Sequence, residues 1–158
     1  MFNFLKKKKA VPLHAIADGC VINLSEVPDE VFSNRMMGDG FAIKPTNGVI
    51  TSPVEATVEN IFPTKHALGL KTDKGIEILL HLGIDTVELN GEPFEMCVQV
   101  GDKVTPDTVL AKIDLEKIKA AKKSNELMVI FTNGDIQSID VQYGDTKHSM
   151  EIGTLQMN

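Results

Sequence analysis

Cysteine is scarce in this sequence, and its scarcity excludes several classes of protein. Only Cys20 and Cys97 are present. Two thiols are too few for a disulfide framework, and their spacing does not match a structural zinc site. We therefore expect both thiols to be free and the protein to work in the reducing environment of the cytoplasm.

Long hydrophobic runs are also absent. One of the longest apolar stretches, residues 76–84, is interrupted by Glu77 and His81. It is far shorter than the ~20 residues that a membrane-spanning helix needs. The sequence therefore predicts that this is not an integral membrane protein.

Positive charge is in the minority, with 16 Lys and Arg against 22 Asp and Glu and a net charge of −6. Proteins that bind nucleic acids owe their affinity to basic side chains that neutralise phosphates. We therefore expect no nucleic-acid partner. An acidic chain is better suited to a partner protein with a basic surface.

The 158 residues suit one domain with a single core. The first residues differ from the rest, because Phe2, Phe4 and Leu5 precede a run of lysines at residues 6–9 and no long apolar signal segment follows. We interpret residues 1–10 as a flexible tail, in which residues 1–9 could make weak contact with anionic lipid. Residues 11–158 are then the single folded domain.

The pattern of that domain predicts an all-β fold. Short apolar runs alternate with turns rich in Gly, Asp and Asn, as in antiparallel β-sandwiches and barrel-sandwich hybrids. Residues 114–123 are the one candidate for a helix, with Asp114 as its N-cap, so helices should be few and short. The expected strands are Val21–Leu24, Phe41–Lys44, Gly48–Thr51, Ala56–Ile61, Ala67–Lys71, Ile76–Leu82, Val109–Ile113, Leu127–Phe131 and Met150–Leu155.

Histidine is the first candidate for chemistry, because the chain has four histidines and no phosphate-binding loop, zinc-protease motif or nucleophile elbow. His81 lies in a strand whose alternation sends Ile78, Leu80 and Leu82 to one face and His81 to the other. The first face should be core. The imidazole would then emerge from a rigidly anchored strand, which suits a reactive group.

His66 lies on the preceding strand, and residues 73–75 form the hairpin signal between the two. A two-residue loop would pair His66 with His81. A three-residue loop gives better hydrophobic matching but sends the histidines to opposite faces. A bulge near Gly69 would reconcile these two registers.

Three chemistries compete for such a histidine pair. His66 and His81 could bind zinc, but a third ligand would be needed. General acid–base catalysis would need a pocket and a carboxylate, for which Asp85 is the nearest candidate. A phosphoryl carrier fits better, because a neutral imidazole is nucleophilic near pH 7 and a second imidazole can donate a hydrogen bond to the transferred group.

Two segments around these histidines, FPTKHA at residues 62–67 and GIEILLHLGIDTV at residues 75–87, closely resemble a known family. That family is the glucose-type IIA component of the bacterial phosphoenolpyruvate-dependent sugar phosphotransferase system. Further similarity lies in VPDEVF at residues 27–32, MGDGFAIKP at residues 37–45 and VGDKV at residues 100–104. Together these segments cover most of the chain from residue 15 to residue 115.

The resemblance implies a β-sandwich that works as a phosphotransferase component, with His81 as the residue phosphorylated on Nε2. It also implies that His66 supports the phosphoryl group and that Thr64 is hydrogen-bonded to His66. The donor would be the histidine phosphocarrier protein HPr, and the acceptor a cysteine on the sugar-specific IIB domain of a permease. No cofactor would be required beyond the covalently carried phosphoryl group.

The resemblance further implies a partner-binding surface around the histidines. Its apolar part would consist of Phe32, Met36, Met37, Leu79 and Leu82. Asp29 and Asp85 would meet cations on the partner. Free-standing members of the family often regulate transporters or metabolic enzymes as well, so such partners are also expected.

Two alternatives remain open at this stage. The segment at residues 100–104 has the turn pattern of biotinyl- and lipoyl-carrier domains, but the exposed Met-Lys-Met hairpin of those carriers is absent. The other alternative is a purely regulatory binding protein with the same fold. Such a protein would not need both His66 and His81.

Overall fold

The structure is a computed structural model that describes residues 10–133 and 136–158. The expected tail and its lipid contact fall on residues 1–9, which lie outside the described residues. Ala10, which the sequence assigned to the tail, is instead the first residue of strand β1.

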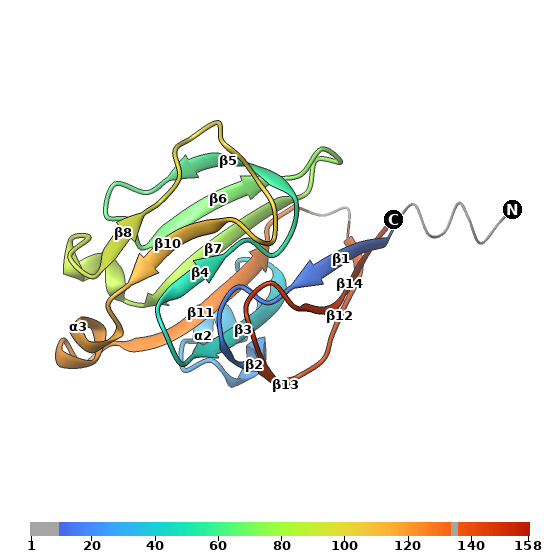
Figure 1. The fold of residues 1–158 in the computed structure, drawn as a ribbon. Coiled ribbons are helices and arrows are strands. Elements are labelled where there is room, and N and C mark those ends of the chain that lie inside the picture. The colour runs from blue at the N-terminus through green and yellow to red at the C-terminus, as the bar shows by residue number, and fades with distance from the viewer. Residues whose placement is uncertain (1–9, 134–135) are drawn as a thin grey trace, which may run out of the picture.

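The described chain forms three antiparallel sheets (Figure 1). In the largest sheet the strands follow the order β13 (Gly144–Thr146), β2 (Gly19–Asn23), β3 (Asp39–Pro45), β11 (Ser124–Phe131), β7 (Glu77–Ile84), β6 (Ala67–Lys71), β5 (Ala56–Ile61) and β9 (Lys103–Val104). A second sheet contains β4 (Val49–Thr51), β10 (Val109–Ile113) and β8 (Phe94–Met96). The third contains β1 (Ala10–His14), β14 (Glu151–Met157) and β12 (Ile136–Val141), which brings the two ends of the described chain together.

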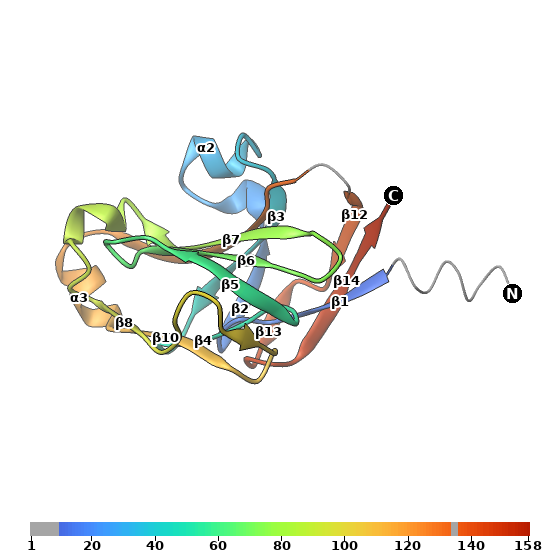
Figure 2. The ribbon, with the colours of Figure 1, turned by 90° about the horizontal axis from the view of Figure 1, so that it is seen from above.

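The sheets form a sandwich with different layers on the two faces of the large sheet. Figure 2 shows β4, β8 and β10 on one side of β5, β6 and β7, and helix α2 (Glu30–Ser33) on the other side. The main hydrophobic core includes Leu80 and Leu82 of β7 together with Ile50 and Leu110 of the second sheet. A smaller cluster holds Phe32 of α2 against the opposite face of the large sheet. We call this opposite face the outer face.

This architecture confirms the predicted all-β sandwich, and each of the nine expected strands is present with shifts of a few residues at its ends. The helix predicted at residues 114–123 is present as the shorter α3 (Leu115–Ala120), and Asp114 caps it by accepting a hydrogen bond from the amide of Lys117. In the described part of the chain, no helix has both the length and the apolar character needed to cross a membrane.

The strands that the sequence did not predict are β1, β8, β9, β12 and β13. Three of them are two or three residues long, which is too short for a periodic pattern to be recognised. The other two, β1 and β12, lie at the edges of the third sheet and carry few buried residues. Their pairing with β14 therefore leaves little signal in the hydrophobic pattern.

Candidate functional site

His81 projects from the middle of the large sheet. The burial of β7 alternates as the sequence predicts, with Leu80 and Leu82 completely buried and His81 half-buried on the outer face. The ring of Phe32 packs against the imidazole at a centroid distance of 4.8 Å. Nδ1 of His81 lies 2.7 Å from the carbonyl oxygen of Gly83. Because a carbonyl can only accept, Nδ1 carries the proton, and Nε2 keeps the lone pair that can react.

His66 comes from the loop that joins β5 to β6. Lys65 takes a left-handed conformation with φ of 59°, and this turn directs the chain into β6. The side chain of His66 is only 7% exposed and packs edge-on against Phe62 at 5.3 Å. Its Nδ1 lies 2.6 Å from the hydroxyl oxygen of Thr64. The predicted contact between Thr64 and His66 is therefore present.

The two imidazoles meet, with ring centroids 5.1 Å apart and planes at 76° to each other. The register between β6 and β7 is the one favoured by hydrophobic matching, in which Ala67 pairs with His81 and Leu70 with Ile78. It continues without a bulge, so the expectation that this register separates the histidines was wrong. His66 precedes β6, and the turn at Lys65 frees it from the alternation of the strand.

The bulge that the sequence suggested near Gly69 lies instead on the other side of β6. There the register shifts between Val58 and Asn60 of β5, and Asn60 pairs with Gly69. A Cβ on Gly69 would collide with the side-chain oxygen of Asn60. Glycine at this position therefore serves the packing of the bulged strand, whereas the histidine pair does not depend on it.

Burial controls the protonation of both histidines. Desolvation lowers the pKa of His66 below its usual 6.5, and the neighbouring His81 lowers it further. Desolvation also lowers the pKa of His81, although the Gly83 carbonyl and the carboxylates of Asp29 and Asp85 act in the opposite direction. Both imidazoles are thus kept neutral near pH 7, the form in which a ring nitrogen can act as a nucleophile.

The apolar residues expected around the histidines differ widely in their exposure to solvent. Met36 and Met37 are 72% and 43% exposed, while Leu79 is half-buried on the outer face. Phe32 is mostly buried, and it contacts His81 directly. Leu82 was wrongly assigned to an exposed surface. It is completely buried in the main core, because strand alternation turns it away from His81.

The acidic residues Asp29 and Asp85 are close enough to His81 to affect its pKa. Asp29 also caps α2, since its Oδ1 accepts hydrogen bonds from the amides of Val31 and Phe32. Asp85 is exposed and has a left-handed backbone with φ of 59°. Both carboxylates therefore border the histidine pair.

Sequence reasoning gave no role to three residues of the segments around this site. Gly83 supplies the carbonyl that orients His81, and its φ of 89° favours glycine. Val31 of α2 and Val87 of the 3-10 helix η2 (Thr86–Leu89) are large hydrophobic side chains that are 42% and 46% exposed. All three lie inside the segments that carry the family resemblance, but nothing in the local pattern indicates which atoms or faces they present.

The histidine pair offers two nitrogen ligands to a metal ion. Among residues 10–133 and 136–158, no group of three or more His, Cys, Asp and Glu side chains could hold a metal. A tetrahedral zinc ion at His66 and His81 would thus need ligands from another molecule or from water.

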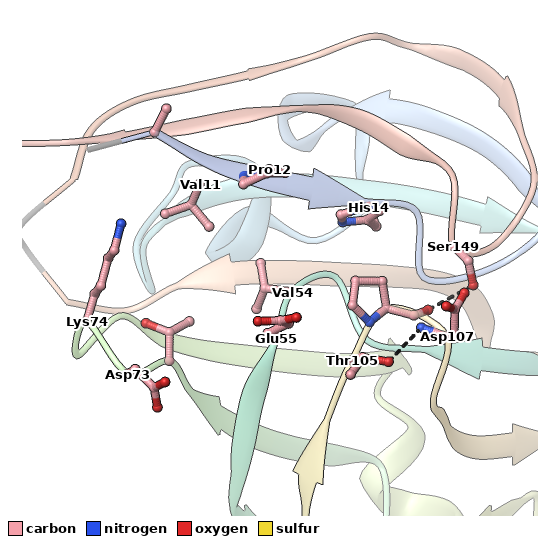
Figure 3. Close-up of a pocket in the computed structure, with 13 residues that line it drawn as sticks. Val11, Pro12, His14, Val54, Glu55, Asp73, Lys74, Thr105, Asp107 and Ser149 are labelled. Atoms are coloured by element: carbon pink, nitrogen blue, oxygen red, sulfur yellow. Dashed lines mark hydrogen bonds between the residues drawn. The ribbon is translucent and has the colours of Figure 1, made fainter. Parts of the chain in front are cut away.

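An open pocket of about 720 Å³ has neither His66 nor His81 among its lining residues. Figure 3 shows the side chains that line it. Its walls come from β1, from the loop before β5, from the turn between β6 and β7 and from the turn at residues 105–107. His14 lies in it, with Nδ1 3.3 Å from the carbonyl oxygen of Pro53. Of the four histidines only His14 lines this pocket, and none of the expected partner-binding residues does.

Residues 11–136 match the sequence model of a family described as the phosphoenolpyruvate-dependent sugar phosphotransferase system, EIIA 1. The match covers most of the chain, and it includes both histidines and the segments around them. The chain therefore belongs to this family, as its resemblance to glucose-type IIA components implies.

Similar proteins carry names from the same system. The chain is 49% identical over 131 residues to the "PTS system glucose-specific EIICBA component" of Streptococcus pneumoniae, and 46% identical over 138 residues to the protein of the same name in Staphylococcus saprophyticus. These alignments cover 82% and 87% of this chain but only 18% and 20% of the relatives. The chain thus spans about one fifth of their length.

A solved structure shares the complete fold. It is described as the glucose permease IIA from Mycoplasma capricolum and superimposes with a TM-score of 0.88 at 39% sequence identity. The superposition covers 92% of this chain and 96% of that one. This agreement supports the β-sandwich and assigns the chain to the IIA class of the phosphotransferase system.

Proposed function

We propose that this protein is a phosphoryl carrier that accepts a phosphoryl group on Nε2 of His81 and passes it on toward sugar uptake. The observation that supports this most directly is the hydrogen bond from Nδ1 of His81 to the Gly83 carbonyl. It leaves Nε2 as the basic nitrogen of a neutral imidazole, which is the atom that an incoming phosphoryl group requires. The family to which the chain belongs, a component of a sugar phosphotransferase system, also supports phosphoryl transfer.

The first transfer is an in-line displacement at phosphorus. The lone pair of Nε2 attacks the phosphoryl group of a phosphohistidine on the donor, which we infer to be HPr. The Nε2–P bond forms as the donor's N–P bond breaks, and that electron pair returns to the donor imidazole. Nδ1 of His81 keeps its proton and its hydrogen bond to the Gly83 carbonyl throughout. Such transfers depend mainly on positioning and on stabilisation of the phosphoryl oxygens.

His66 supplies that stabilisation in our proposal. The hydroxyl of Thr64 donates to Nδ1 of His66, so that Nε2 of His66 carries a proton and can donate to a phosphoryl oxygen. The centroid distance of 5.1 Å between the two rings supports this role, because it brings both imidazoles within reach of one phosphoryl group. Thr64 is then a positioning residue for His66 through its 2.6 Å contact.

The second transfer passes the group to a cysteine of a sugar-specific IIB domain. A thiolate attacks the phosphorus, the S–P bond forms, and the electron pair of the N–P bond returns to Nε2 of His81. The relatives named EIICBA components support a IIB partner, because their names combine IIA with IIB and IIC. Regulated transporters and metabolic enzymes are further candidate partners for the same face.

We propose that both partners dock on one surface around the histidines. The partner surface consists of Phe32, Met36, Met37 and Leu79, bordered by Asp29 and Asp85. Exposed methionines suit a surface that binds more than one partner, because their side chains adapt to different shapes. The two carboxylates would attract a basic partner and raise its association rate.

This mechanism needs no cofactor, because the imidazole itself is the nucleophile. Zinc at the histidine pair is a separate proposal, and it makes the opposite prediction for activity. A zinc ion bound to Nε2 of His81 would compete with phosphorylation. Added zinc should therefore inhibit labelling if it binds there.

The test is incubation with phosphoenolpyruvate, enzyme I and HPr, followed by intact mass analysis under alkaline conditions that preserve phosphohistidine. We expect one acid-labile phosphoryl group in the wild type and none in His81→Gln. His14→Gln and His148→Gln serve as matched controls and should be labelled normally. Labelling that persists in His81→Gln, or that maps to His14 or His148, would refute the assignment.

A further inference from the structure

Three consecutive peptide groups at the end of β7 anchor both histidines. The amide of Leu82 donates to the carbonyl oxygen of His66 at 2.7 Å and ties that loop residue to the strand. The carbonyl of Leu82 accepts the hydroxyl of Thr86 at 2.6 Å. The next carbonyl along the chain, on Gly83, orients His81. The backbone around Leu82 and Gly83 thus fixes the positions of the two imidazoles relative to each other.

Thr86 contacts the backbone at Leu82 and Gly83. It is completely buried, one of the few buried polar side chains of the described residues. Its hydroxyl reaches back from η2 to the end of β7, across the left-handed residues Gly83 and Asp85. Its methyl group fills the space next to Gly83, because a Cβ added to Gly83 would lie 2.5 Å from that methyl carbon. Thr86 therefore contacts this turn through both branches of its side chain.

We propose that Thr86 is a positioning residue that holds the Gly83 carbonyl against Nδ1 of His81 and so fixes His81 in the Nδ1–H tautomer. Thr86 itself touches neither the phosphoryl group nor the imidazole in this role. The effect of Thr86 on the rate of phosphoryl transfer rests on the proposed function. Its effect on the tautomer of His81 does not.

The physical reason is that the tautomer of a neutral histidine is set by the hydrogen bond that its other nitrogen makes. If the Gly83 carbonyl turns away, the proton is free to move to Nε2, and Nε2 then has no lone pair for attack. A hydroxyl bound to the preceding carbonyl holds the Leu82–Gly83 peptide plane in place, and the methyl group of Thr86 packs against Gly83 itself. Together these two contacts restrain the adjoining plane, which carries the Gly83 carbonyl.

The experiment compares wild type with Thr86→Val, Thr86→Ser and Thr51→Val. Valine keeps the shape of threonine but removes the hydroxyl, and serine keeps the hydroxyl but removes the methyl. Thr51 is a matched control, because it is also completely buried and its hydroxyl donates to a backbone carbonyl, that of Ala15, in a different sheet. The two measurements are the 15N NMR shifts of the His81 ring, which report the tautomer, and the rate of HPr-dependent labelling.

We expect the wild type and Thr51→Val to hold His81 as the Nδ1–H tautomer and to be labelled at equal rates. Thr86→Val should show a mixture of tautomers and slower labelling, by about 2- to 12-fold, the factor that corresponds to one neutral hydrogen bond. Thr86→Ser keeps the hydroxyl, so it should have the wild-type tautomer of His81 and the wild-type labelling rate. Circular dichroism establishes that each variant is folded.

The proposal is overturned if Thr86→Val retains the Nδ1–H tautomer and the wild-type rate, or if Thr51→Val produces the same changes. Should Thr86→Val fail to fold, Thr86→Ala takes its place, because it also removes the hydroxyl. A folded Thr86→Ala that keeps the Nδ1–H tautomer and the wild-type rate overturns the proposal. Absence of labelling in the wild type would instead refute the proposed function. The tautomer measurement would still test Thr86 in that case.

Discussion

The Nδ1–H of His81 donates to the carbonyl of Gly83 at 2.7 Å, whereas Nδ1 of His66 faces the hydroxyl of Thr64 at 2.6 Å. A carbonyl accepts only, so it fixes the proton of His81 on Nδ1. A hydroxyl can donate as well as accept, so the contact with Thr64 permits the Nε2–H tautomer of His66 that its proposed role requires. The two imidazoles are therefore not equivalent, and this difference supports a nucleophile and a supporting donor rather than two interchangeable acceptors.

Replacing His66 with alanine should slow transfer without moving the acceptor site. The variant loses one hydrogen bond to a charged group, which is worth roughly 1.5–3 kcal/mol. If that contact forms mainly in the transition state, labelling slows by about 10- to 150-fold, since about 1.36 kcal/mol corresponds to tenfold. We expect His66→Ala to be phosphorylated on His81, only slowly, and to pass the group to a IIB domain poorly.

The control for that experiment is His81→Ala, which keeps His66 and should be inactive in both steps. Circular dichroism of both variants separates loss of the fold from loss of chemistry. Equal labelling rates for His66→Ala and the wild type would mean that the two histidines do not cooperate.

Replacing Gly83 with alanine should destabilise the protein more than the same change at Gly101. Both glycines have positive φ, of 89° and 95°, so alanine is strained at each. Only at Gly83 would the new Cβ also collide, with the methyl carbon of Thr86 at 2.5 Å and the carbonyl of Ser124 at 3.1 Å. Nothing lies within 4 Å of the corresponding atom at Gly101.

Urea unfolding of the two variants measures this difference. We expect Gly101→Ala to lose about 1–3 kcal/mol for backbone strain alone, and Gly83→Ala to lose more. Gly83→Ala should also be labelled slowly, because the strain displaces the carbonyl that orients His81. Equal losses of stability in the two variants would show that the contact with Thr86 does not restrict this position.

The sequence was sufficient for the fold class and for the face on which His81 lies. Strand β7 alternates as far as Leu82, so the burial of Leu80 and Leu82 required His81 to point the other way. The same alternation predicts that Leu82 lies in the core, so the surface position that the family resemblance implies for it is wrong. Local periodicity was the more reliable guide for a residue inside a strand.

The meeting of His66 with His81 could not be predicted from strand pairing. It depends on the left-handed turn at Lys65, and lysine is not a residue type that signals positive φ. The Gly83 carbonyl and the Thr86 hydroxyl are equally invisible to periodicity, because they act through a backbone turn after the strand. The alternation of side chains along a strand predicts the face of the sheet on which each residue lies. These contacts depend instead on the backbone path of the loops.

The partner surface predicts that Met37→Lys weakens docking of HPr while the protein stays folded. Met37 is 43% exposed, so a lysine there has access to water and should not disturb the core. It would place a positive charge where a basic, partly apolar partner is expected to bind. Transfer from phospho-HPr should therefore slow, mainly through a higher KM.

Met150→Lys is the matched control, because Met150 is 52% exposed and does not belong to the partner surface. This variant should be labelled at the wild-type rate. If Met37→Lys is folded and has an unchanged rate, Met37 does not belong to the docking surface.

The lowered pKa values of His66 and His81 predict how labelling and stability depend on pH. Burial is the main cause for both residues, and their pKa values lie below the usual 6.5. Between the folded-state pKa and 6.5, the unfolded chain binds more protons than the folded protein, so the free energy of unfolding rises with pH. This contribution is complete above pH 6.5 and is lost as the pH falls through the folded-state pKa.

The measurements are an NMR titration of the two rings and urea unfolding at pH values from 5 to 8, on the wild type and on the double variant His66→Gln/His81→Gln. We expect both rings to become protonated only below pH 6.5, and the double variant to lose less stability between pH 6.5 and pH 5. Labelling should persist below pH 6.5 for as long as His81 stays neutral, since a protonated imidazole has no lone pair to attack phosphorus. Titration of His81 above pH 6.5, or equal pH dependence of unfolding in the two proteins, would contradict the view that burial keeps these imidazoles neutral.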